Sequence, residues 1–118
     1  MSKQLKKQWV AALRSGKYMQ TTGYLKKKEE DGKCAYCCLG VLCSVAGLRL
    51  KKKSSNGFFG HLDEWGLPEE DGITHVPNEH GERIGLPKKV QDRLMRMNDS
   101  RGKTFKQIAT YIEKSKSI

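Results

Sequence analysis

The sequence has no long, uninterrupted apolar run. Its longest mainly apolar stretch covers residues 34–48 and is broken by Gly40, Ser44 and Gly47. A helix that spans a bilayer needs about 20 consecutive apolar residues, so we expect no membrane contact. The first residues, MSKQLKKQWVAALRSGK, also lack the apolar segment of a secretion signal. Together these absences predict a cytoplasmic protein.

The sequence also lacks the motifs of several common enzyme classes. It contains no G-x-x-x-x-G-K-S/T phosphate-binding loop, no H-E-x-x-H zinc motif and no G-x-S-x-G nucleophile motif. An ordinary ATPase, metalloprotease or serine hydrolase is therefore disfavoured. The basic runs match no helix-turn-helix or aromatic RNA-binding signature. We expect a protein that is not an enzyme and that needs no cofactor.

Positive charge is what the sequence has in excess. There are 23 Lys and Arg residues against 13 Asp and Glu, yet residues 63–82 contain seven of the acids and no Lys or Arg. The whole chain carries +10 and this segment −7, which leaves +17 on the remainder. Such a field attracts phosphate-bearing partners, whether nucleotide or nucleic acid. Solubility is the alternative explanation of scattered surface lysines.

The N-terminal part predicts a helix followed by a hairpin. Leu5, Trp9 and Leu13 recur at helical spacing over residues 3–14, and Gly16 follows where a left-handed cap is favoured. Further on, an Asp-Gly turn at residues 31–32 separates an extended start at residues 24–25 from a return over residues 34–36. We expect a small antiparallel β-hairpin there.

The apolar middle of the chain predicts a central helix over residues 36–46. Leu39, Val41, Leu42 and Val45 surround its axis instead of forming one stripe, so it should be covered on most sides. A line of small residues permits close approach of another backbone, for which the N-terminal helix is the natural candidate; these residues are Gly40, Cys43, Ser44 and Gly47.

The C-terminal part predicts two more helices. The first should begin with Pro87 as its first helical residue and run to residue 97. The second opens with Thr104 and Gln107 in a capping-box arrangement, and Phe105, Ile108, Ala109 and Ile112 mark its buried face.

A less regular, partly acidic region joins these parts over residues 50–84. Residues 51–57 are expected to form an exposed loop, the apolar residues of 58–65 to fold back onto the core, and residues 73–76 to include a short strand. The whole predicts one domain over residues 1–118, of α+β class, with a central buried helix packed by three others and a small hairpin.

Four cysteines fall close together in the CAYCCLGVLC segment. A cytoplasmic chain keeps its thiols reduced, so a disulfide framework is excluded. A zinc site could combine Cys34 and Cys37 with His75 and His80, but the distance between the pairs exceeds that of a usual finger. We therefore expect no metal.

Cys37 is a second possibility, as a nucleophile. A thiol in the first turn of a helix is activated by the helix dipole, and Cys37 lies on the face most open to solvent. No histidine is positioned by the sequence to act as its base. The interpretation that we favour makes Cys34, Cys38 and Cys43 small buried apolar side chains.

Two segments combine groups that can bind a phosphate-bearing ligand. RSGKYMQ offers Arg14, Lys17, Tyr18 and Gln20, which could hold phosphate, stack on a base and read its edge. MNDSRGKTF places further polar side chains at a helix entry, where anions bind readily, namely Asn98, Asp99, Arg101 and Lys103. Helix capping and turn formation are the structural alternatives.

Three motifs resemble a widespread family of small, largely uncharacterised proteins of bacteriophages and prophages. They are W-x-x-A-L-R-S-G-x-Y-x-Q, Y-C-C-L-G-V-L-C and N-D-x-x-G-x-x-F-x-x-I-A-x-x-I-E. The resemblance implies a non-structural protein made in the cytoplasm of an infected bacterial host. It brings no established activity, and this chain has more lysines than we expect of relatives.

These observations favour an accessory protein for host takeover or counter-defence that binds a phosphate-bearing ligand through its basic surface, preferably a nucleotide signal. Three alternatives stay open: a nucleic-acid-binding protein, a protein inhibitor whose acidic segment docks on a host factor, and a cysteine-dependent enzyme that uses Cys37. The sequence shows no apolar stripe that would indicate an oligomer interface, and the oligomeric state stays open.

Overall fold

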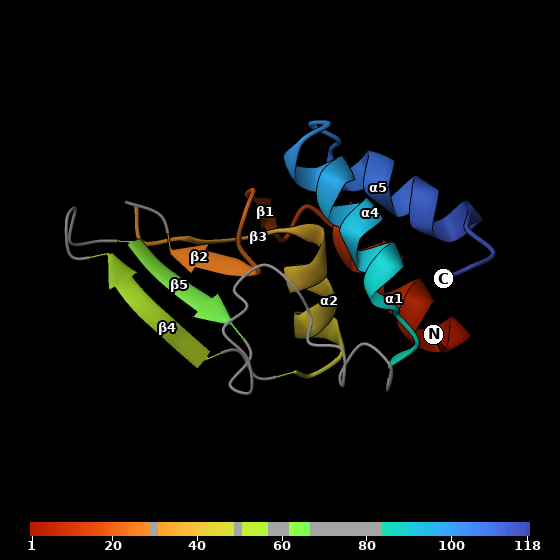
Figure 1. The fold of residues 1–118 in the computed structure, drawn as a ribbon, viewed down its shortest axis with the longest axis horizontal. Helices are drawn as coiled ribbons and strands as arrows, with labels where there is room; N and C mark the ends of the chain where they lie inside the picture. Colours follow the sequence, from red (N-terminus) through yellow and green to blue (C-terminus); the bar gives the residue numbers. More distant parts are fainter. Residues whose placement is uncertain (29–30, 49–50, 57–61, 67–83) are drawn as a thin grey trace.

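A computed structural model describes residues 1–28, 31–48, 51–56, 62–66 and 84–118, with the backbone alone described in 51–56 and 62–66. Helices gather at one end and a sheet extends from the other (Figure 1). The elements in chain order are α1 (Lys3–Arg14), β1 (Met19–Gln20), β2 (Lys26–Lys28), β3 (Cys34–Tyr36), α2 (Cys38–Val45), β4 (Lys51–Asn56), β5 (Leu62–Gly66), α4 (Lys88–Asp99) and α5 (Phe105–Lys114). The fold is of α+β class, as the sequence predicts.

Helix α1 occupies the predicted residues because its N-terminus is capped and its periodic side chains are buried. The Ser2 hydroxyl accepts a hydrogen bond of 3.1 Å from the backbone N–H of Leu5. Trp9 and Leu13 lie in the core, and Gly16 has a φ of +76° that ends the helix.

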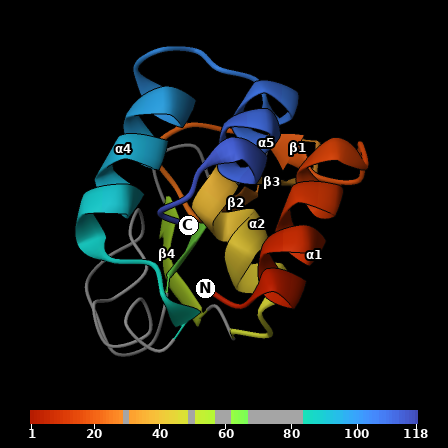
Figure 2. The ribbon, with the colours of Figure 1, turned by 90° about the vertical axis from the view of Figure 1, so that its right-hand side faces the viewer.

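Helix α2 is the buried centre of the helical part, as predicted. Figure 2 shows α2 among α1, α4 and α5. The Trp9 indole N–H of α1 donates a hydrogen bond of 3.0 Å to the carbonyl oxygen of Cys38. The close approach at Gly40 is made by the backbone of Leu25, however, and not by α1. A side chain at position 40 would overlap the Leu25 carbonyl group.

The sheet has the strand order β1-β3-β2-β5-β4. Strands β1 and β3 are parallel, and the remaining pairs are antiparallel. The predicted hairpin is present as β2 and β3, with Gly32 at a φ of +84° in its turn. The prediction of a loop over residues 51–57 was wrong for Lys51–Asn56, which form β4. A segment rich in Lys and Ser has a low propensity for strand structure. Here the backbone of the segment pairs with β5, and this pairing holds it in the strand conformation.

The two C-terminal helices match their predicted cores. Leu94 and Met97 of α4 are buried, although Pro87 precedes the helix as its N-cap instead of opening it. In α5, the Thr104 hydroxyl and the Gln107 side chain form the predicted capping box. The four predicted apolar positions of α5 are all buried. The expected strand at residues 73–76, like Phe58 and Phe59, lies outside the described residues.

Candidate ligand-binding site

The two sequence segments expected to bind a ligand meet in the structure. The Gln20 side-chain N–H₂ group donates to Asn98 Oδ1 at 2.9 Å and to the carbonyl oxygen of Lys103 at 2.8 Å. The Gln20 Oε1 atom accepts a hydrogen bond of 3.2 Å from the backbone N–H of Phe105. Strand β1 is thereby joined to the turn between α4 and α5.

The side-chain amide groups at this junction already form hydrogen bonds within the protein. Asn98 is 1% exposed, and its Oδ1 atom also accepts from the backbone N–H of Cys38 at 3.2 Å. Its Nδ2 atom donates to the Thr21 carbonyl oxygen and to Asp99 Oδ1, both at 2.8 Å. With both donors and two acceptor bonds in use, Asn98 has a structural role. Gln20 has both donors and one acceptor bond in use, so both amides join parts of the protein to each other.

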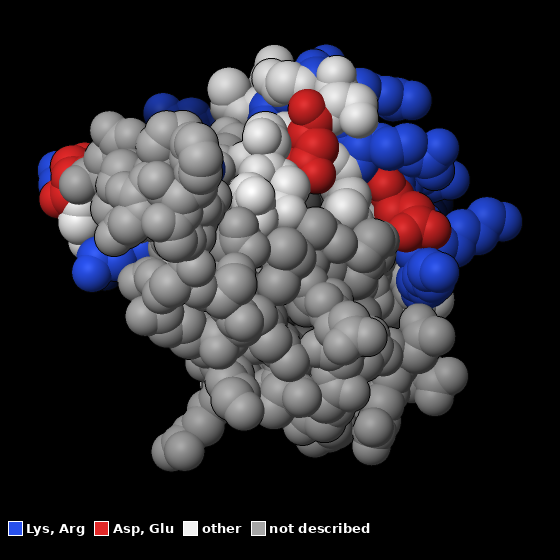
Figure 3. Space-filling view, turned by 60° about the vertical axis from the view of Figure 1, so that its left-hand side comes forward, with Lys and Arg blue, Asp and Glu red and all other residues white. Residues whose placement is uncertain are grey.

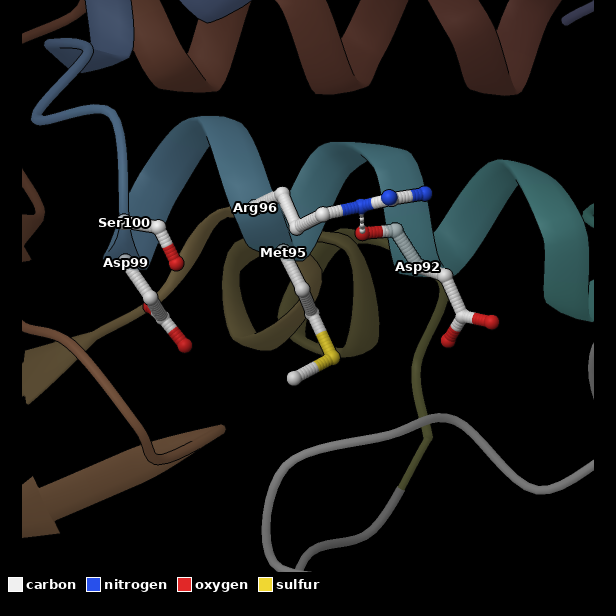
Figure 4. A pocket seen from close by; sticks show the side chains of 5 residues that line it. All are labelled: Asp92, Met95, Arg96, Asp99 and Ser100. Carbon is white, nitrogen blue, oxygen red and sulfur yellow. Dashed lines mark hydrogen bonds between the residues drawn. The ribbon is translucent and has the colours of Figure 1, made fainter.

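Asp99 lies at a pocket of about 400 Å³ on α4 that is lined by Asp92, Met95, Arg96, Asp99 and Ser100. Figure 4 shows the Arg96 side chain running along the helix toward Asp92, away from Asp99. Two carboxylates border this space, so it is a poor site for a phosphate. Arg101 and Lys103 are exposed on the following turn and do not line the pocket.

Arg14 is held by α5. Its guanidinium donates to both carboxylate oxygens of Glu113, at 2.8 and 3.1 Å. This hydrogen bonding raises the pKa of Arg14 and lowers the pKa of Glu113. Arg14 is therefore part of an exposed ion pair between helices and not a dedicated ligand group.

Tyr18 and Lys17 lie next to residues that sequence reasoning missed. The Tyr18 ring meets the Tyr36 ring edge to face, with centroids 5.1 Å apart and planes at 84°. The Lys26 ammonium nitrogen lies 5.9 Å from the centroid of the Tyr36 ring. We call these four residues, Lys17, Tyr18, Lys26 and Tyr36, the tyrosine–lysine site. It joins the turn after α1 to strands β2 and β3.

Hydrogen bonds and a turn fix the geometry of this site. The Tyr18 hydroxyl and the Ser44 hydroxyl are 2.9 Å apart and share a hydrogen bond, which ties the phenol to α2. The backbone N–H of Lys17 donates to the Ser15 hydroxyl oxygen at 3.1 Å. A pocket of about 270 Å³ lies here, lined by Ala11, Ala12, Ser15, Lys17 and Tyr18. Lys17 and Tyr18 border this pocket, whereas Lys26 and Tyr36 do not line it.

Burial raises the pKa of the Tyr36 phenol, with smaller contributions from Cys34 and Tyr18. The phenol therefore stays neutral at physiological pH and does not repel an anion.

The basic side chains on the helical side of the molecule do not form a continuous positive surface. Figure 3 shows them along one edge with acidic side chains between them, so the described part of that face is not uniformly positive.

Comparison with known proteins identifies the family. A family model described as a domain of unknown function, DUF8296, matches residues 1–116. The chain belongs to this family. No curated protein and no solved structure matches it. The DUF8296 match includes all four residues of the tyrosine–lysine site, but it carries no activity to transfer.

The β2–β3 hairpin is a signal that could have brought the missed residues of this DUF8296 chain close together. Lys26 pairs directly with Tyr36 across the turn at residues 31–32. Counting outward from the Asp-Gly turn places Tyr36 opposite Lys27, one residue away from the observed pair, so the turn gives the hairpin but not its register. Sequence reasoning treated the lysine run as general surface charge and therefore did not single out Lys26.

The cysteines form part of the core. Cys37 is 3% exposed, and burial raises its pKa to about 12 despite the opposing effect of the backbone N–H groups of Gly40 and Leu39. The expectation that Cys37 is partly open was wrong, because Cys37 is the N-cap residue of α2 and its side chain is buried in the core. Cys38 and Cys43 are buried as predicted, whereas Cys34 is half-buried.

All four cysteines are free thiols. Among the residues that the structure describes, no three potential metal ligands cluster together. His75 and His80, the other members of the zinc hypothesis, lie outside that part of the chain. Within the same described part, no helix has the length and apolar character to cross a membrane.

Proposed function

We propose that this protein is a non-enzymatic accessory protein that binds a phosphate-bearing ligand, a nucleotide, at the tyrosine–lysine site. The observation that carries the proposal is the contact of two aromatic rings, Tyr18 and Tyr36, with the Lys26 ammonium group beside the second ring. Lys17 adds a second cation at the turn that lines the adjoining pocket.

The chemistry of the site suits the two halves of a nucleotide. A base is planar and stacks on an aromatic face, which contributes about 1–3 kcal/mol per base. A phosphate group accepts charge-assisted hydrogen bonds from lysine ammonium groups. The neutral Tyr36 phenol, its pKa raised by burial, adds no repulsion. One nucleotide is thus the unit that the site recognises.

A cysteine-dependent activity has less support. The thiolate is the reactive form of cysteine, and burial raises the pKa of Cys37 to about 12. At neutral pH the group is a buried neutral thiol. The proposal therefore assigns no covalent chemistry to the CAYCCLGVLC segment.

The biological role that we propose is host takeover or counter-defence in an infected bacterium, by sequestration of the bound nucleotide. Sequestration needs no catalytic group, in keeping with the absence of enzyme motifs from the sequence. The resemblance of three sequence motifs to those of bacteriophage proteins supports this context.

Mass spectrometry of ligands released from protein purified out of host cells tests the proposal. We expect a nucleotide with the wild-type protein and none with the Tyr36→Leu variant. The matched control is Tyr111→Leu on α5, a half-buried tyrosine outside the site. Wild-type protein free of nucleotide, or equal amounts on both variants, would contradict the proposal.

A further inference from the structure

The two lysines of the tyrosine–lysine site lie at different ends of it. The pocket of about 270 Å³ is bordered by Lys17 and Tyr18, whereas Lys26 and Tyr36 do not line it. From Tyr18 the site continues to the Tyr36 ring, whose centroid is 5.1 Å from that of Tyr18, and then to the Lys26 ammonium nitrogen, 5.9 Å from the Tyr36 centroid. Two aromatic rings therefore separate the pocket end from the Lys26 end.

The strand register supports this separation. Strands β1, β3 and β2 lie side by side (Figure 1), and Gln20, Tyr36 and Lys26 occupy one row across them. Neighbouring strands lie about 4.8 Å apart, so the backbone of Lys26 is about 10 Å from that of Gln20 across the sheet. Lys17 precedes Gln20 by three residues, which displaces it along the strand direction instead. The two lysines thus start from opposite corners of the site.

Contacts within the protein fix the spacing of the rings. The Tyr18 hydroxyl is hydrogen-bonded to the Ser44 hydroxyl of α2 at 2.9 Å, and the two tyrosine planes stand at 84°. The pairing of β2 with β3 holds the Lys26 backbone opposite Tyr36. A ligand that uses the whole site must therefore match a spacing that the protein sets.

Each end of the site suits an anionic group. Lys17 is the only charged residue among the described residues that line the pocket. At the other end, Lys26 lies beside the Tyr36 phenol, which burial keeps neutral by raising its pKa. A ligand with one phosphate group can occupy one end alone, whereas a ligand with two separate phosphate groups can place one at each lysine.

We infer that the nucleotide bound at the tyrosine–lysine site carries phosphate groups on both its 3′ and 5′ oxygens. The inference rests on the proposed function and names the class of nucleotide. The base stacks on a tyrosine ring, one phosphate group contacts the Lys17 ammonium group and the other contacts that of Lys26.

The chemistry of the ribose favours this class over a 5′-diphosphate. The 3′ and 5′ oxygens leave the sugar in different directions, so their phosphate groups diverge. The two phosphate groups of a 5′-diphosphate share a bridging oxygen and remain together on one side of the sugar. The divergent arrangement reaches both ends of the site while the base stays on the aromatic rings.

Isothermal titration calorimetry tests the inference with three adenosine nucleotides, namely the 5′-monophosphate, the 5′-diphosphate and the 3′,5′-bisphosphate. The last two have the same number of phosphate groups and differ in where these are attached. We expect the bisphosphate to bind at least about tenfold more tightly than either of the others, because a second hydrogen bond between charged groups contributes that much or more.

The variants Lys17→Gln and Lys26→Gln each remove one of the two phosphate contacts. We expect both to reduce the preference for the bisphosphate over the monophosphate to less than about threefold, since one lysine then remains. The matched control is Lys7→Gln, which removes an exposed charge from α1 and should keep the full preference. Circular dichroism verifies that all three variants fold.

The outcomes separate the inference from the proposed function. A monophosphate or a 5′-diphosphate that binds as tightly as the bisphosphate would overturn the inference and leave the proposed function standing. Absence of binding by all three nucleotides would overturn both. A preference that survives in either site variant, or that is lost in Lys7→Gln, would overturn the inference because the two lysines would not be the groups that hold the phosphates.

Discussion

The side-chain oxygen of Asn98 accepts a hydrogen bond of 3.2 Å from the backbone N–H of Cys38, joining the end of α4 to the start of α2. The N–H of Cys38 belongs to the first turn of a helix, where backbone donors have no partner within the helix. A buried side chain from another helix therefore supplies the cap that α2 lacks from its own N-cap residue.

Replacement of Asn98 by Ala should destabilise the protein strongly. It leaves the Cys38 N–H, the Thr21 carbonyl oxygen and one Gln20 donor without their partner. Each buried polar group that loses its hydrogen bond costs about 1–3 kcal/mol, so we expect a loss of at least about 3 kcal/mol in the free energy of unfolding. Urea denaturation measures it. The exposed Arg101→Ala should stay within about 0.5 kcal/mol of the wild type, and an equally small loss for Asn98→Ala would refute this role.

Replacement of Gly40 by Ala should also be costly, because the added methyl group meets the Leu25 carbonyl group. Overpacking of a well-packed core costs about 1–3 kcal/mol, and we expect the upper end because a backbone must move. Thermal and urea denaturation measure the loss. Ser44→Ala on the exposed side of the same helix loses one hydrogen bond, about 1 kcal/mol. A Gly40→Ala protein as stable as the wild type would show that the Leu25 backbone does not approach α2 here.

Labelling with a thiol-reactive dye at neutral pH should distinguish the four cysteines. Cys34 is half-buried, whereas Cys37, Cys38 and Cys43 are buried, and burial raises their pKa values. We expect one fast-reacting thiol in the native protein and four after denaturation. The variant Cys34→Ser should remove the fast phase. A fast phase that instead disappears in Cys37→Ser would reopen the nucleophile hypothesis.

Alkaline pH should weaken the fold through the buried thiols. Burial raises the pKa of Cys43 from 9.0 to about 12, so between these values the folded state holds a proton that the unfolded state has lost. The free energy of unfolding then falls as pH rises, by up to about 1.4 kcal/mol per pH unit for each such thiol.

Urea denaturation under reducing conditions between about pH 9 and about pH 10.5 checks this slope, within the window set by the two pKa values. We expect Cys43→Ala to make the slope shallower, while Cys37 and Cys38, whose pKa values burial also raises, keep part of it. The same slope in the wild type and in Cys43→Ala would show that Cys43 is not shielded from water.

The helices could be predicted because their signals are local. Trp9 and Leu13 recur at helical spacing in α1, and the Thr104 and Gln107 pair of α5 is read directly from four residues. Strand β4 could not be predicted, since Lys51–Asn56 has neither the alternation nor the β-branched residues of a strand. Its conformation depends on pairing with β5, and a register shift between Lys52 and Ser54 removes any simple period.

The residues of the candidate site also differ in how far local sequence signals reveal them. Sequence reasoning selected Lys17 and Tyr18 because they adjoin a helix end, and it also selected Gln20 and Asn98. Their side chains are 78 positions apart in sequence and 2.9 Å apart in space. No local sequence signal shows that two amides so far apart in the chain form a hydrogen bond with each other. Tyr36 and Lys26 could be paired only by combining the hairpin with its register.

Chemical-shift mapping of backbone amides during titration with nucleoside monophosphates tests the central claim most directly. The account predicts that the largest changes cluster at Lys17, Tyr18, Lys26 and Tyr36, and that Tyr36→Leu abolishes them. No change up to a concentration of about 1 mM, where binding is worth only about 4 kcal/mol, would contradict it. So would changes confined to the Asp92–Asp99 pocket of α4 or to the lysines of α1.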